Sequence, residues 1–85
     1  MQTFEYIIKD EAGIHARPAG FLVKKVTGLT STVTITKDEK SVNASKLFAL
    51  MSLGVKKGDK ITVNISGENE ESDAELIKTF FEENL

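Results

Sequence analysis

Three segments of this chain alternate apolar and polar residues, and each of them is polar along nearly the whole of its second face. The polar residues are threonines at 32–36, threonine, asparagine and serine at 60–66, and threonine and glutamate near residue 4. This alternation predicts β-strands that are buried on one side only. Helices can cover such a sheet only on its apolar face, so the chain should form two layers.

Helical spacing appears between the predicted strands. One helix should follow Pro18 and end near Gly28, a second should span 45–53, and a third should begin at about Asn69. The apolar residues that recur at helical spacing are Ala19, Leu22, Val23 and Val26 in the first helix, Leu47, Leu50 and Met51 in the second, and Ala74, Ile77 and Phe81 in the third, where Leu76 and Phe80 lie near the edge of the apolar face.

Strands are expected near residues 3–8, at 32–36, at 41–43 and at 60–66. The order β-α-β-β-α-β-α then predicts an α+β fold, a two-layer open-faced sandwich. Its four-stranded, mainly antiparallel sheet would carry three helices on one face. With 85 residues the chain should form a single domain over 1–85.

Composition narrows the range of functions. Eleven basic and thirteen acidic residues give a net charge of −2, which argues against nucleic acid as a partner. No cysteine is present, which excludes disulfides and thiol catalysis and is compatible with a reducing cytoplasm, where we expect the protein to act. No secretory signal is visible, and the longest apolar run, 47–51, is too short to enter a bilayer.

The only histidine and the only proline lie together in Gly13-Ile14-His15-Ala16-Arg17-Pro18. Proline suits the first turn of a helix, so His15 and Arg17 should lie where a turn becomes a helix. Unpaired backbone N–H groups and the positive end of the helix dipole converge there and form an anion site. A neutral imidazole at this point could accept a phosphoryl group, while the planar guanidinium of Arg17 could hold the phosphate with two hydrogen bonds.

The backbone donors for such a phosphate must come from Ala16, Arg17 or Ala19, because Pro18 has no N–H. A loop histidine beside a solvated arginine is the alternative interpretation of the same spacing. Metal binding fails on ligand count, since one imidazole and no thiol cannot build the usual zinc sites, and no cofactor is expected. Composition does not exclude a Ser-His-Asp triad, but no nucleophile-elbow motif is present.

A second candidate surface lies on the short apolar helix 45–53. Most of its side chains should pack into the core, but a helix of about two turns cannot bury all of them. We therefore expect Phe48, with Leu47 or Met51, to stay exposed and form a docking patch. Gly20, one turn after the histidine, would leave room for the close approach of a partner. The acidic cluster 68–75 is expected to be a solvated helix start.

Residues 13–19 and Met51-Ser52-Leu53-Gly54, with the predicted element order, resemble the HPr family of the bacterial sugar phosphotransferase system over essentially the whole chain. The resemblance implies that enzyme I donates a phosphoryl group to Nδ1 of His15 and that the group passes on to IIA domains of sugar permeases. Arg17 would stabilise the phosphate, and the surface around Gly20, Leu47, Phe48 and Met51 would serve both partners. Such a protein is a relay, suited to a monomer, rather than a self-sufficient enzyme.

The chain departs from the family pattern at two places. Lys46 occupies the position at which Gram-positive members carry a serine that HPr kinase phosphorylates, and Ser45 stands one residue earlier. Either Ser45 has taken over this regulatory role or the switch is lost or altered, and we expect the latter. Ala12 replaces a residue that is often small and polar. A regulatory or nitrogen-related signalling module that uses the same surface is the alternative function.

Overall fold

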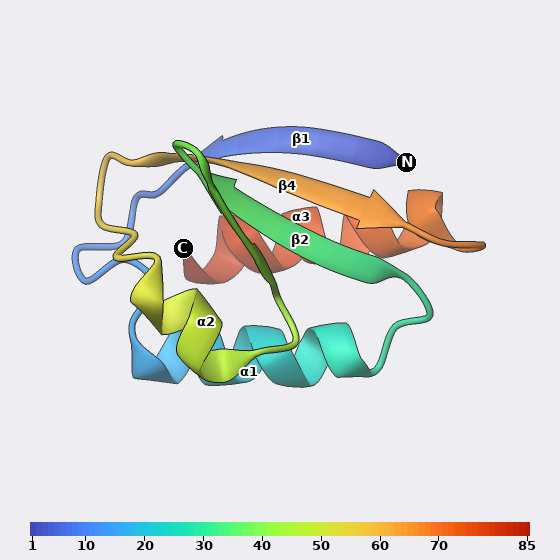
Figure 1. The fold of residues 1–85 in the computed structure, drawn as a ribbon, viewed down its shortest axis with the longest axis horizontal. Helices are drawn as coiled ribbons and strands as arrows, with labels where there is room; N and C mark the ends of the chain where they lie inside the picture. The colour runs from blue at the N-terminus through green and yellow to red at the C-terminus, as the bar shows by residue number, and fades with distance from the viewer.

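The computed structural model describes residues 1–85 and contains four strands and three helices (Figure 1). The strands are β1 (Gln2–Ile7), β2 (Thr32–Lys37), β3 (Lys40–Asn43) and β4 (Lys60–Ser66). The helices are α1 (Ala16–Thr27), α2 (Leu47–Ser52) and α3 (Glu70–Asn84). The predicted order β-α-β-β-α-β-α is confirmed.

The four strands form one sheet in the order β1-β4-β2-β3, and every neighbouring pair is antiparallel. The register places polar residues beside one another across the sheet: Thr34 lies between Asn64 of β4 and Asn43 of β3. All three helices lie on the opposite face (Figure 1). The two-layer architecture expected from the polar strand faces is therefore confirmed, and the sheet is wholly antiparallel.

The core lies between the sheet and the helices. Most of its completely buried side chains come from the inner faces of β2 and β4 and from one face of each helix, and Ile8 and Ala44 add to them just after β1 and β3. Phe81 of α3 is the largest of them, and its ring makes edge contacts with Phe4 at 5.9 Å and Tyr6 at 5.5 Å between centroids. The Tyr6 hydroxyl also donates to the Phe81 carbonyl oxygen at 3.0 Å, which fixes α3 against β1. Burial raises the pKa of this hydroxyl, and the nearby Glu82 carboxylate adds to the shift.

Two expectations about the helices are wrong in detail. The second helix begins at Leu47 rather than at Ser45, because the Ser45 N–H and hydroxyl both donate to the Asn43 side-chain oxygen instead of entering a helix. Within the acidic cluster, Asp73 is buried rather than solvated, and its carboxylate accepts a hydrogen bond from the Ser31 hydroxyl at 2.6 Å. None of the three helices combines the length and apolarity needed to cross a membrane.

Candidate functional site

The start of α1 is where the turn after β1 delivers the only histidine. His15 is the N-cap residue, with extended backbone angles (φ −104°, ψ −174°), and its side chain makes no capping hydrogen bond. About half of that side chain (46%) is exposed. Pro18 lies in the first helical turn, as predicted, and is buried. The imidazole therefore lies at the N-terminus of α1 and remains accessible to a partner.

Two backbone donors at this helix start are free. The Ala19 N–H donates to the His15 carbonyl oxygen at 2.9 Å, so the expectation that Ala19 could serve an anion is wrong. The N–H groups of Ala16 and Arg17 make no hydrogen bond within the chain, and the first turn contains no acidic residue. An anion beside His15 would therefore meet two unpaired N–H groups and the positive end of the helix dipole.

Arg17 supplies a cation at the same place. It is exposed, and its guanidinium forms no ion pair or hydrogen bond with any other group of the chain. A guanidinium without an internal partner keeps its full donor fork for a ligand. The arrangement is compatible with the role in phosphate stabilisation that we expect for Arg17.

The loop before His15 is held by contacts with the segment after α2, which the sequence did not predict. Gly13 has a positive φ of 67°, and a Cβ atom there would lie 2.2 Å from the Val55 carbonyl oxygen. The same oxygen accepts the Ile14 N–H at 3.1 Å. The segment after α2 is held in turn by Asp59, whose carboxylate accepts from the Lys56 N–H at 2.8 Å and pairs with the Lys37 ammonium at 2.9 Å. His15 is thus positioned by contacts far apart in sequence.

Asp10 is a further site residue that sequence reasoning missed, because residue spacing does not show which way its side chain points. One of its carboxylate oxygens lies 3.9 Å from Nε2 of His15. The same oxygen accepts the Ala12 N–H at 3.0 Å, an arrangement that an aspartate at the start of a turn favours. The start of α1 therefore has a carboxylate near the imidazole in addition to the unpaired N–H groups of Ala16 and Arg17.

The second candidate surface lies on α2, which packs against α1 (Figure 1). Phe48 is 82% exposed and Met51 is 38% exposed, whereas Leu47 is partly buried and Leu50 is fully buried. The expected exposure of Phe48 is confirmed. On α1, Gly20 is partly exposed, and a Cβ atom there would meet no other atom within 4 Å. The space above Gly20 is open to a partner.

Ser45 and Lys46 stand just before α2. Lys46 is the exposed N-cap residue, and Ser45 is partly buried with its hydroxyl 2.7 Å from the Asn43 side-chain oxygen. The position at which the family pattern places a serine is therefore held by an exposed ammonium group. Ser45 already has an internal partner for its hydroxyl.

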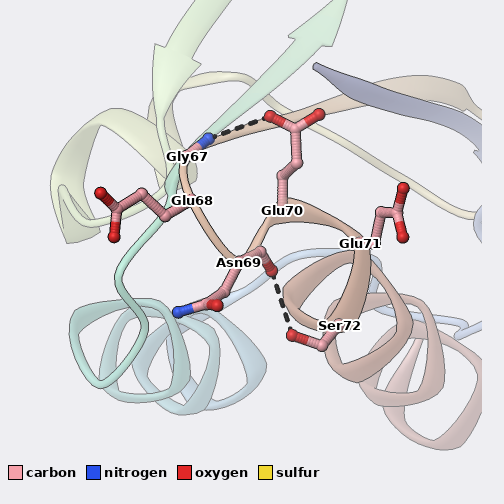
Figure 2. A pocket seen from close by; sticks show the side chains of 6 residues that line it. All are labelled: Gly67, Glu68, Asn69, Glu70, Glu71 and Ser72. Atoms are coloured by element: carbon pink, nitrogen blue, oxygen red, sulfur yellow. Dashed lines mark hydrogen bonds between the residues drawn. The ribbon is translucent and has the colours of Figure 1, made fainter.

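A surface pocket is present at the start of α3, at the other end of the molecule from the start of α1 (Figures 1 and 2). Glutamates dominate its lining, and the Glu70 side chain accepts the Gly67 N–H at 3.2 Å (Figure 2). The amino group of Met1 and this N–H hold the pKa of Glu70 below its usual range. The pocket is unsuited to phosphate. No group of three or more histidine, aspartate or glutamate side chains could hold a metal ion.

Comparisons with known proteins agree with this geometry. The family described as "PTS HPr component phosphorylation site" matches residues 2–83. The phosphocarrier protein HPr of Borreliella burgdorferi is 43% identical over 82 residues, which cover 92% of this chain and 95% of that protein. The solved structure of a mycoplasma histidine-containing phosphocarrier protein is 33% identical with a TM-score of 0.89, covering 93% of this chain and 90% of the other.

An HPr of Thermoanaerobacter tengcongensis solved as a dimer is 34% identical with a TM-score of 0.67, covering 95% of this chain and 98% of that one. The family match spans nearly all residues and includes the exposed histidine at the start of α1. The chain belongs to the HPr family, the phosphocarrier proteins of the phosphotransferase system.

Proposed function

We propose that this protein accepts a phosphoryl group from phosphorylated enzyme I on Nδ1 of His15 and passes it to IIA domains of sugar permeases in the cytoplasm. The observation that carries the proposal is the half-exposed imidazole beside two unpaired backbone N–H groups at the start of α1. The Nδ1 lone pair forms the new P–N bond while the bond to the donor breaks and its electron pair returns to the donor.

The residues around His15 act by placing and stabilising charge. Phosphoryl transfer is catalysed mainly through positioning and electrostatics, so a small protein can take part without a deep pocket. The N–H groups of Ala16 and Arg17 and the guanidinium of Arg17 would hold the phosphate oxygens. The reverse step uses the same contacts, because the group leaves for the next acceptor along the path by which it arrived.

The docking patch of Gly20, Leu47, Phe48 and Met51 serves the two partners in turn. A relay must release each partner quickly, so its complexes should be small and short-lived and the free protein monomeric. Size-exclusion chromatography with light scattering tests the monomer, and an early-eluting dimer at micromolar concentration contradicts it.

Regulation through HPr kinase is not expected with lysine at position 46. Intact mass after kinase and ATP treatment should stay unchanged, and stoichiometric phosphate on Ser45 overturns this expectation.

The central experiment is incubation with enzyme I and labelled phosphoenolpyruvate. Wild-type protein should take up one acid-labile phosphoryl group, and His15→Ala should take up none. The matched control is Ser45→Ala, which removes a different potential acceptor and should label normally. Label that persists in His15→Ala contradicts the assignment. Reconstituted sugar uptake with and without the protein then separates sugar transport from a regulatory or nitrogen-related role.

A further inference from the structure

Asp10 faces the histidine from a firmly fixed position. Its backbone N–H donates to the Leu85 carbonyl oxygen at 2.9 Å, and its own carbonyl oxygen accepts the Gly13 N–H at 3.1 Å. Its side chain accepts the Ala12 N–H at 3.0 Å. Two hydrogen bonds therefore fix the backbone of Asp10 and a third holds its carboxylate, whereas the imidazole 3.9 Å away has no capping bond and can rotate.

The neighbouring carboxylate does not share this arrangement. Glu11 pairs instead with the Lys57 ammonium at 2.7 Å. Asp10 is the only acidic side chain within ion-pair distance of His15. An effect of negative charge on the imidazole can therefore be assigned to one residue.

The chemistry of the pair defines which nitrogen is free. A neutral imidazole has one N–H donor and one nitrogen with a lone pair, and an ionised carboxylate can only accept. A separation of 3.9 Å is too long for a hydrogen bond, so at rest the carboxylate acts through its field, and a small ring rotation would close the contact. Either way, the nitrogen that faces Asp10 is favoured as the one that carries hydrogen. That nitrogen is Nε2.

We propose that Asp10 is a positioning residue for His15: it selects the tautomer with hydrogen on Nε2 and so leaves the Nδ1 lone pair free to attack phosphorus. The inference rests on the proposed function for its consequence, though not for the tautomer itself. When the P–N bond forms at Nδ1, the ring becomes an imidazolium that keeps its hydrogen on Nε2, and Asp10 stabilises that positive charge. The charge disappears again when the phosphoryl group leaves.

The test combines nitrogen NMR of His15 with transfer kinetics. At about pH 8.5, where an ordinary imidazole is neutral, wild-type protein should be mainly the Nε2–H tautomer. Asp10→Asn keeps an acceptor for the Ala12 N–H but loses the charge, so the tautomer ratio should fall about threefold and the rate of phosphorylation by enzyme I about three- to fivefold. Asp10→Glu should recover part of both losses. Glu11→Gln removes a neighbouring charge from the same loop and should change neither.

The two readouts separate this inference from the proposed function. The NMR measurement needs no phosphoryl donor, so it decides the role of Asp10 even if enzyme I fails to label the wild-type protein, an outcome that refutes the proposed function. An unchanged tautomer ratio in Asp10→Asn overturns the inference. An equal shift in Glu11→Gln overturns it as well, because the effect would then reflect loop charge in general.

Discussion

The starts of α1 and α3 are both helix N-termini at the protein surface, but the charges in their first turns differ. At α3, Asn69 is the N-cap residue, three acidic residues occupy the first turn, and Glu70 satisfies the Gly67 N–H (Figure 2). At α1, the first turn has no acidic residue and the N–H groups of Ala16 and Arg17 are unpaired. Acidic side chains surround the start of α3 and disfavour an anion there, whereas the start of α1 has none and is left open to one.

This difference separates stability from function. Acidic residues in a first helical turn stabilise the helix by about 0.3–1 kcal/mol each, so leaving α1 without them lowers stability. The compensation at α1 comes from outside the helix. Gly13 and Ile14 pack against Val55, and Pro18 and Ala19 are buried. The open start of α1 therefore depends on the loop before it and on the segment after α2, which we call the frame of this helix start.

The largest effect is expected when that frame is disturbed. Gly13→Ala would place a Cβ atom 2.2 Å from the Val55 carbonyl oxygen at a residue with φ of +67°. We expect a loss of about 3 kcal/mol or more in the free energy of unfolding, measured by urea denaturation. Gly54→Ala is the matched control, because φ is +66° but no atom lies within 4 Å, so only about 1 kcal/mol should be lost. Equal losses in the two variants would mean that the contact with Val55 is unimportant.

The next effect concerns the free cation at α1. Arg17→Gln removes the only charged group that could hold the phosphate there through two hydrogen bonds, so phosphorylation by enzyme I should slow by about 10- to 100-fold without loss of stability. Rapid-quench labelling measures the rate. Lys25→Gln removes a cation from the last turn of the same helix and is the control. A normal rate in Arg17→Gln would mean that the backbone donors at the start of α1 stabilise the phosphate without the guanidinium.

The sequence predicted the open site but only part of what surrounds it. The motif around His15 is local, since a proline three residues later and a glycine two residues before mark a helix start. The threonine faces of the strands likewise predicted the two-layer fold. Both inferences depend only on periodicity and on neighbouring residues.

The contacts that escaped prediction join distant parts of the chain. Lys37 and Asp59 are 22 residues apart, and Ser31 and Asp73 are 42 apart. No periodic pattern marks such pairs, because only the completed fold brings them together. Asp10 is different, since it lies five residues before His15, but whether its carboxylate points toward the ring depends on how the turn closes.

A smaller effect is expected on α2. Phe48→Ala should leave the free energy of unfolding within about 0.5 kcal/mol of wild type, because the side chain is 82% exposed. Transfer from enzyme I and to IIA domains should each slow by about five- to thirtyfold, as for an aromatic anchor at an interface. Leu76→Ala on α3 is the control, since that side chain is also exposed but lies outside the docking patch. Equal slowing in both variants would show that α3 contacts the partners as well.

The smallest effect is expected at Asp59, which holds the segment after α2 through its contacts with Lys56 and Lys37. The Lys37 ammonium and the Lys56 N–H hold the pKa of Asp59 below its usual range. Since the ionised form is the one favoured by folding, its stabilisation is complete above about pH 4 and disappears as the pH falls through the folded-state pKa. Asp59→Asn should therefore have a slightly lower urea midpoint than wild type at pH 7. This difference in midpoint should become smaller below about pH 4.

Glu39→Gln provides the control for this last measurement. Glu39 is exposed on the turn between β2 and β3 and forms no ion pair, so the gap between this variant and wild type should stay near zero at every pH. If the urea midpoint of Asp59→Asn lies as far below wild type at about pH 3 as at pH 7, the ion pair between Lys37 and Asp59 does not stabilise this segment. It would mean that the geometry of the Lys56 hydrogen bond, rather than the charge on Asp59, keeps the segment after α2 in place under His15.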